Sequence, residues 1–213
     1  MDEGVDGWVN SKMDKNTSNE RACLVVDQYG GILPYYEAFY IHSIIYSAER
    51  SLAAFERFTA ALAGSGSESL IVASVQEALA HAAAVSRFFW PMHDENRLAV
   101  ARGNRLKNAF ELGDSSPMKW RKLRAAFEHF DEDLDKFLLQ DQAGHFFPGP
   151  LVAPHGLANE SNGHIFRLVD PENGICVLLG EKFEFRPIQQ EVRRVLLRAQ
   201  EMDSKGCRLP VPA

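Results

Sequence analysis

The sequence is poor in the features that most readily identify a function. Its 213 residues include only three cysteines, Cys23, Cys176 and Cys207, which lie far apart and form no CxxC pair. This distribution gives no disulfide framework and suits a reducing cytosol. No GxGxxG, GxxxxGK[ST], HExxH or GxSxG motif occurs, which removes the commonest nucleotide-binding, protease and hydrolase signatures. We therefore expect no cofactor and no metal.

A long hydrophobic run is also missing. No uninterrupted stretch of 18 apolar residues occurs, and this predicts that no segment spans a membrane. The N-terminal segment MDEGVDGWVNSKMDKN is acidic and polar, without the apolar core of a secretion signal. We expect a cytoplasmic protein that does not bind membranes.

Positive charge is scarce overall but concentrated in one segment. The net charge of −6 argues against a dedicated nucleic-acid binder. Between Arg97 and Arg124, however, eight basic residues face only two acidic ones, so this segment carries +6 and the remainder −12. Such a region can attract a polyanion, although a solvated loop and two helix faces explain it at least equally well.

What is present indicates a single globular domain, or one domain with an appendage. Hydrophobic residues make up 46% of the chain and charged residues 24%, as in ordinary folded proteins. Residues 1–22 lack periodicity and predict a disordered or loosely attached tail, and residues 23–31 predict a short strand or an extended lead-in. Apolar residues at intervals of three and four then predict four helices, over about 35–62, 69–89, 96–111 and 117–140.

The C-terminal part of the chain has a different pattern. Residues 143–163 are rich in proline and glycine and predict a long connection. HIFRLVD-PENG-ICVLLG predicts a β-hairpin, which EKFEF could continue beyond a bulge at Gly180. A final amphipathic helix begins at Pro187. The predicted fold class is mainly α, a four- to five-helix bundle over 23–140, with the loop, small β-hairpin and helix of 141–213 packed on it.

The stretch LRAAFEHFDEDLDKF, residues 123–137, has the most distinctive pattern. On one continuous helix Arg124 and His129 would lie at the two edges of a polar arc, about 140° apart. They would converge only across a two-fold contact with a second copy. An ordinary solvated helix face explains the same arc. The opposite arc is a clean apolar stripe that we expect to be buried: Trp120, Leu123, Phe127, Phe130, Leu134 and Phe137.

This stretch resembles the signature segment of the HEPN superfamily, helical-bundle domains with an Arg-x4-6-His motif on a core helix. Arg124 and His129 match the motif with four residues between them, and the resemblance covers roughly residues 33–140. It implies a homodimer in which the Arg and His of two subunits gather in a cleft and cut RNA without metal. Arg87 and His93 also fit the spacing, but Pro91 lies between them and would interrupt the helix.

Two hypotheses of function follow. In the first, the protein is a metal-independent endoribonuclease of a toxin or defence system, with RNA and an antitoxin as partners. His129 would act as acid or base, Arg124 would bind the scissile phosphate, and Arg121 and Lys122 would add phosphate contacts. In the second, the protein is a non-catalytic helical module that binds a partner protein or a nucleotide. Ala125 stands where active members often carry a polar residue, commonly Asn, and favours the second.

Other candidate residues are assigned to structure. His145, His155, His164 and Cys176 are too irregularly spaced for a structural zinc site. His42 lies among apolar residues and is expected to be partly buried with a satisfied partner. The tyrosines and phenylalanines of the first predicted helix are expected to form part of the core.

Overall fold

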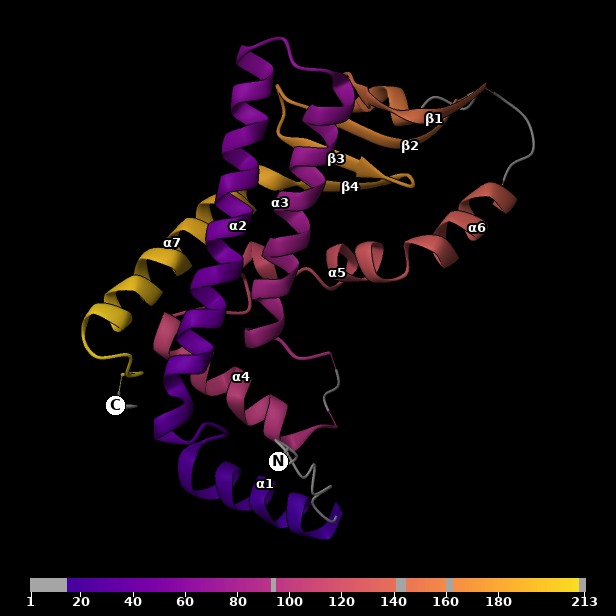
Figure 1. The fold of residues 1–213 in the computed structure, drawn as a ribbon. Helices are drawn as coiled ribbons and strands as arrows, with labels where there is room; N and C mark the ends of the chain where they lie inside the picture. Colours follow the sequence, from indigo (N-terminus) through magenta and orange to yellow (C-terminus); the bar gives the residue numbers. More distant parts are fainter. Residues whose placement is uncertain (1–14, 93–94, 141–144, 160–162, 211–213) are drawn as a thin grey trace, which may run out of the picture.

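The computed structural model describes residues 15–92, 95–140, 145–159 and 163–210, which are mainly helical with a four-stranded sheet in the C-terminal part (Figure 1). The predicted mainly helical class is confirmed, but the predicted bundle of four or five helices is not, because the described residues form seven α-helices. In chain order the helices are α1 (Lys15–Tyr29), α2 (Glu37–Ala63), α3 (Glu68–Phe89), α4 (Arg97–Phe110), α5 (Arg121–Glu128), α6 (Phe130–Gln140) and α7 (Phe185–Ser204). The strands are β1 (His145–Val152), β2 (Gly163–Asp170), β3 (Ile175–Leu178) and β4 (Glu181–Glu184), and 3-10 turns occur at η1 (Pro34–Tyr36), η2 (Pro117–Lys119) and η3 (His155–Asn159).

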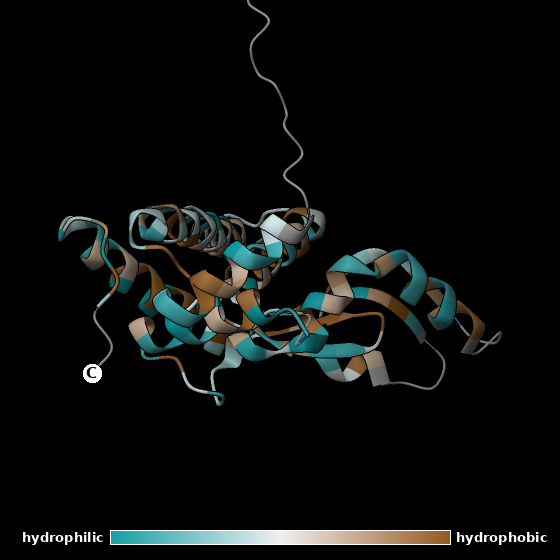
Figure 2. Ribbon diagram, turned by 90° about the horizontal axis from the view of Figure 1, so that it is seen from below, coloured by the Kyte–Doolittle hydropathy of each residue, from teal (hydrophilic) through white to brown (hydrophobic). Residues whose placement is uncertain are grey.

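The long helices α2 and α3 lie side by side and form the centre of the molecule (Figure 1). Ser67 caps the start of α3, because its hydroxyl accepts a hydrogen bond from the Leu70 amide at 3.3 Å. The two helices approach closely enough for the buried Ser51 hydroxyl to donate to the Ala78 carbonyl at 2.8 Å. Hydrophobic residues gather between the helices and the sheet, and hydrophilic residues cover the outer turns (Figure 2).

The C-terminal helix α7 packs along α2 and joins it to the same core. The rings of Phe55 and Phe58 on α2 lie 6.0 and 5.4 Å from the ring of Phe185 at the start of α7. Burying these large side chains stabilises the protein by about 1.5–3 kcal/mol each. The predicted final helix is therefore confirmed, with a start at Phe185.

The N-terminal region differs from its prediction. Residues 15–29 form helix α1, so the predicted tail does not extend to residue 22 and residues 23–31 are not an extended lead-in. Residues 1–14 lie outside the described residues. Helix α1 lies against α4, where Asp27 and Arg97 approach to 3.7 Å. Its apolar residues follow a weak pattern and most remain exposed or half-buried, which explains why periodicity failed to indicate a helix.

The sheet has the strand order β1-β2-β3-β4. The predicted hairpin is confirmed as β2 and β3, which pair antiparallel. Leu179 and Gly180 have φ angles of 48° and 80° and form the tight turn between β3 and β4, so the chain reverses where a bulge was predicted. The predicted connection over 143–163 instead includes β1, which pairs parallel to β2.

The predicted fourth helix is broken into three pieces. It starts at Pro117 as expected, but Pro117 opens the 3-10 turn η2, which Ser116 caps, and α5 begins only at Arg121. His129 has φ −119° and ψ 31°, which ends α5 before α6 begins at Phe130. One helical wheel therefore cannot describe residues 117–140. Helices α5 and α6 have separate axes, so the residues that face the core differ from those that one continuous helix would bury.

Helix α3 is long and apolar enough, by length and composition alone, to meet the criterion for a membrane-spanning helix. Of the most apolar 18-residue part of this helix, 56% is buried inside the fold. Its apolar residues are therefore accounted for by packing against α2 and the sheet.

Candidate functional site

Arg124 lies inside the protein against the C-terminal end of α3. Its residue surface is 2% exposed, and Nη1 donates a hydrogen bond to the main-chain carbonyl of Trp90. Trp90 is the C-cap residue directly after α3, and the carbonyls at a helix end have no partner within the helix. The guanidinium thus caps α3 and places positive charge at the negative end of its dipole. The predicted exposed position of Arg124 was wrong, because α5 turns this residue inward together with Leu123.

The surroundings of Arg124 are also those of a structural residue. Its Nε is buried and has no hydrogen-bond partner among the described residues. Burial, and then the positive charges of Arg121 and Arg87, lower the pKa of the guanidinium, against the opposing effect of Glu128. Glu128 in turn forms an ion pair with Arg87 of α3, with 2.5 Å between Oε1 and Nη1. These contacts attach α5 to α3.

His129 has a different environment from that of the buried Arg124. It lies at the end of α5 with half of its side chain exposed, and its Nδ1 is 3.9 Å from Oε2 of Glu132. No hydrogen bond or ion pair connects the described side chains of His129 and Arg124. One copy of the chain therefore does not assemble the predicted catalytic pair.

The two predicted phosphate-binding residues are exposed at the start of α5. Lys122 Nζ lies 3.3 Å from Glu181 of β4, an exposed ion pair that contributes little to stability. Arg121 lines two of the hollows described next. Both side chains are accessible to a ligand, in contrast to Arg124.

Three adjoining hollows run along α4, η2 and the start of α5. The first has a volume of about 850 Å³ and shares Asn104 and Lys107 with the second, which has about 210 Å³. The second shares Asp114, Lys119 and Arg121 with the third, which has about 760 Å³. Because neighbouring hollows share lining residues, they adjoin one another along this face, and together they are called the α4–α5 groove below.

Positive charge predominates in the α4–α5 groove. Its acidic residues are Glu111, Asp114 and Glu184. The basic residues that line it are twice as many, and five of the six come from the basic segment found in the sequence: Arg105, Lys107, Lys119, Arg121, Lys122 and Arg198. The basic segment found in the sequence therefore supplies most of the positive charge of the α4–α5 groove.

Several of these cations already have partners. Arg105 pairs with the buried carboxylate of Glu37 at 2.5 Å, and Lys119 pairs with Asp114 at 3.0 Å. Lys107 makes no ion pair within the described part of the chain, although it lies where the first and second hollows meet. A hydrogen bond and the charge of Lys119, with a smaller effect of Lys107, lower the pKa of Asp114. The groove is thus most electropositive around Lys107.

Close packing of α4 against α3 shapes this groove. A Cβ added to Gly103 would meet the Phe89 carbonyl oxygen at 2.7 Å and Pro91 Cδ at 3.1 Å. Only glycine allows α4 to approach the end of α3 so closely. The same approach puts Lys107, one turn further along α4, beside η2.

The residues considered in the sequence as a metal site do not come together in the described structure. His155 Nδ1 is 2.7 Å from the buried Asp170, whereas Cys176 is buried elsewhere, and burial raises the pKa of its thiol to about 12. His164 packs against the ring of Phe146 at 4.6 Å. These residues belong to the sheet and its connections.

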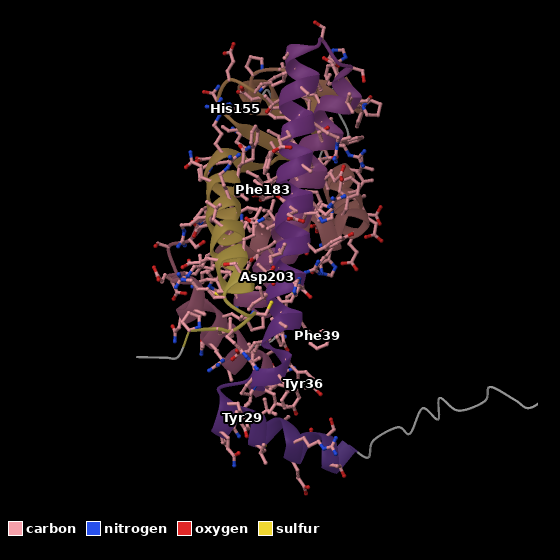
Figure 3. The ribbon with its side chains drawn as sticks, turned by 60° about the vertical axis from the view of Figure 1, so that its left-hand side comes forward. Tyr29, Tyr36, Phe39, His155, Phe183 and Asp203 are labelled. Atoms are coloured by element: carbon pink, nitrogen blue, oxygen red, sulfur yellow. The ribbon has the colours of Figure 1, made fainter. Side chains whose placement is uncertain are left out.

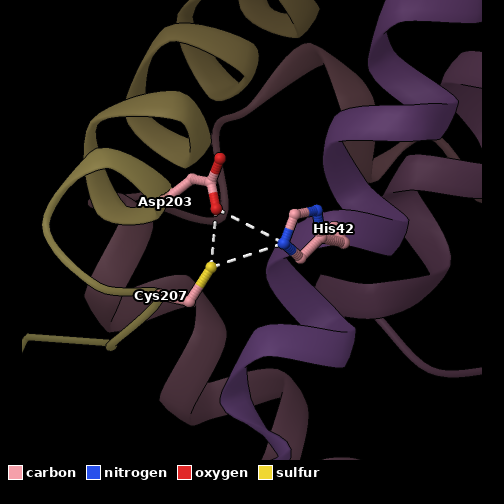
Figure 4. A group of neighbouring side chains, drawn as sticks. All are labelled: His42, Asp203 and Cys207. Atoms are coloured by element: carbon pink, nitrogen blue, oxygen red, sulfur yellow. Dashed lines mark hydrogen bonds and ion pairs between the residues drawn. The ribbon is translucent and has the colours of Figure 1, made fainter.

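A different group, His42, Asp203 and Cys207, does come together, and sequence reasoning missed it (Figure 4). The prediction that His42 is partly buried was wrong, because 61% of its side chain is exposed. Several aromatic residues near it, predicted as core, are also exposed on the outer face of α2 and η1: Tyr35, Tyr36, Phe39 and Tyr46. Figure 3 shows Tyr36 and Phe39 on this side and Asp203 at the end of α7. The only local signal was the spacing of Asp203 and Cys207, four residues apart.

Comparison of the chain with protein-family models, curated proteins and solved structures gives no match. The resemblance to the HEPN superfamily therefore stays a prediction from residues 123–137 and the order of the helices.

Proposed function

We propose that this protein is a non-catalytic, HEPN-like helical module that binds a nucleotide in the α4–α5 groove. The observation that carries the proposal is the excess of positive charge along the groove, with Lys107 unpaired among the described residues at its centre. Lysine and arginine side chains are the usual partners of phosphate groups.

The groove also offers an apolar surface beside its charges. Trp120 lines the third hollow together with Lys119 and Lys122, and it is half-buried with its ring 5.2 Å from that of Phe183. An aromatic ring held in this way can stack on a base, and neighbouring cations can hold the phosphates. Hollows of about 300–1,000 Å³ are typical of small-molecule sites, so the volumes of the first and third hollows suit a nucleotide.

The position of Arg124 separates this proposal from the nuclease hypothesis. A guanidinium that binds a scissile phosphate must reach it, and this guanidinium is buried under α3 on a main-chain carbonyl. Ala125, half-buried beside it, offers no polar group. Binding without cleavage is therefore the function that the geometry supports best.

A titration with fluorescently labelled ATP tests the proposal. Anisotropy should report saturable binding that weakens as salt increases, because ion pairs to phosphate are screened. Replacing Lys107 with alanine removes one charged hydrogen bond, worth about 1.5–3 kcal/mol, and should weaken binding about 10-fold or more. Lys136→Ala is the control, since this exposed lysine pairs with Asp133 on α6, outside the groove. Equal affinity of Lys107→Ala and wild type would contradict the proposal.

The endoribonuclease remains a second candidate, favoured by the half-exposed imidazole of His129, a side chain that can act as a general acid or base. In this hypothesis a homodimer would bring His129 of one copy toward the basic residues Arg121 and Lys122 of the other. RNA cleavage in excess chelator, by wild type beside His129→Ala, decides between the candidates. We expect no cleavage by either. Cleavage by the wild type that disappears in His129→Ala would establish the nuclease instead.

A further inference from the structure

We propose that His42, Asp203 and Cys207 bind a divalent transition-metal ion, zinc in particular, where the end of α7 meets α2 (Figure 4). Nε2 of His42, a carboxylate oxygen of Asp203 and Sγ of Cys207 all lie within 4.8 Å of one another. This inference is independent of the nucleotide proposal, because none of the three residues lines the α4–α5 groove.

The spacing of the three ligand atoms is close to that of a tetrahedral zinc site. Zinc–ligand bonds of about 2.0–2.3 Å place neighbouring nitrogen, oxygen and sulfur ligands about 3.3–3.6 Å apart. His42 Nε2 lies 3.3 Å from Asp203 Oδ1 and 3.5 Å from Cys207 Sγ. Only the Sγ–Oδ1 distance, 2.6 Å, across which the thiol donates a hydrogen bond, is too short for two zinc ligands. A rotation of the half-exposed Asp203 carboxylate, widening this distance by about 1 Å, completes the geometry.

The backbone presents Cys207 to the other two ligands. Helix α7 ends in a turn where Gly206 has φ 94° and Cys207 has φ 56°, a left-handed conformation that is costly for a residue other than glycine. The Cys207 amide donates to the Met202 carbonyl at 2.9 Å, and this bond folds the chain back over the end of the helix. Asp203, one helical turn earlier, and His42 on α2 then face the sulfur. Such strained conformations are concentrated at functional sites.

The ligand types select the class of metal. Thiolate and imidazole ligands favour zinc and its neighbours among the divalent transition metals, whereas magnesium and calcium prefer oxygen ligands. On binding, the metal forms bonds to Sγ, Nε2 and a carboxylate oxygen. The S–H···O hydrogen bond breaks, and the thiol proton leaves to solvent. Because the side chains of His42 and Asp203 are 61% and 42% exposed, water can occupy the fourth position.

A bound metal would fasten the C-terminal segment to α2. Beyond Cys207, the Leu209 amide already donates to Oε2 of the buried Glu37 on α2, at 3.0 Å. The metal would add a second, stronger connection between the same two parts of the chain. We therefore expect zinc to raise the temperature of unfolding, since a ligand that binds only the folded state stabilises it.

Titration of the purified, reduced protein with cobalt(II), followed by displacement with zinc, tests the site. The wild type should bind one cobalt per chain and show a thiolate-to-cobalt charge-transfer band. Loss of a residue that only supports a metal ligand typically weakens binding about 10- to 100-fold. His42→Ala and Cys207→Ser remove ligands themselves and should weaken cobalt binding by at least that much. Cys207→Ser should also abolish the band. The matched control is Cys23→Ser, which removes an exposed free thiol on α1 and should leave both the band and the stoichiometry unchanged.

Circular dichroism of each variant shows whether it folds. If Cys207→Ser does not fold, the conservative variant Asp203→Asn replaces it, with the same expectation of weaker binding. Unchanged cobalt affinity in a folded His42→Ala or Cys207→Ser variant would overturn the proposal, as would loss of the band in Cys23→Ser. In that case the cluster is an ordinary surface ion pair with a thiol beside it.

Discussion

Replacing Arg124 with alanine distinguishes a structural arginine from one that acts on a ligand. The substitution removes the guanidinium that donates to the Trp90 carbonyl and caps α3. The carbonyl remains in the protein interior without its charged partner. If the role of Arg124 is structural, the loss should appear in the stability of the fold.

The magnitude follows from the contacts of this one side chain. A hydrogen bond from a charged group to a buried acceptor contributes about 1.5–3 kcal/mol. The favourable interaction with the end of the α3 dipole adds about 0.3–1 kcal/mol. Part of this is offset, because the variant no longer buries an Nε without a partner. We expect a net loss of about 2–3 kcal/mol in the free energy of unfolding, or about 4–12 °C in Tm for a chain of this size.

Urea unfolding followed by circular dichroism measures this loss. Arg193→Ala is the matched control, because it removes an exposed arginine from α7 and should change stability by less than about 0.5 kcal/mol. The reasoning would be refuted if Arg124→Ala were as stable as the wild type while losing ligand binding or RNA cleavage. Arg124 would then be a ligand-binding or catalytic residue after all.

Two further substitutions test the packing and the sheet. Gly103→Ala should destabilise the protein by about 1–3 kcal/mol in urea unfolding, because the added Cβ would meet the Phe89 carbonyl oxygen at 2.7 Å. This loss should exceed the gain from the higher helix propensity of alanine. Unchanged stability would show that α4 can move away from α3. For the buried Asp170, burial raises the pKa, but hydrogen bonds from His155 and Asn173 outweigh it and the pKa is lowered overall. Since the folded-state pKa is below the ordinary value, this contribution to stability is present above about pH 5 and declines as the pH falls through 4 and below. Asp170→Asn should flatten that acid decline, measured as urea stability against pH, and an unchanged slope would contradict the assignment.

The parts of the fold that were predicted correctly have local signals in the sequence. Ser67 and Asn96 cap α3 and α4 through hydrogen bonds to residues three positions later, and both starts were found from the sequence within a residue or two. The PENG turn likewise gave the β2–β3 hairpin. Such signals act within a few residues and do not depend on the rest of the chain.

Strand β1 was missed because its sequence contradicts the usual rule for strands. Pro148 and Pro150 lack the amide hydrogen that a central strand needs. Here β1 lies at the edge of the sheet, and its register with β2 shifts between Phe147 and Pro150. The prolines are tolerated at that irregular edge. The sequence of β1 alone does not indicate a strand, because the strand forms by pairing with β2.

The candidate sites were predicted less completely because tertiary packing decides them. Periodicity placed Arg124 on a polar arc, but the break at His129 and the contact of α5 with α3 turned it inward. The cluster of His42 with Cys207 joins residues 165 positions apart, which no local pattern indicates. The basic segment, in contrast, was visible because its charges are close in sequence.

The most direct test of nucleotide binding in the α4–α5 groove is the titration of labelled ATP into wild type and Lys107→Ala. We predict saturable, salt-dependent binding by the wild type and affinity about 10-fold or more weaker in the variant. Absence of binding, or binding that Lys107→Ala leaves unchanged, would contradict the proposed function.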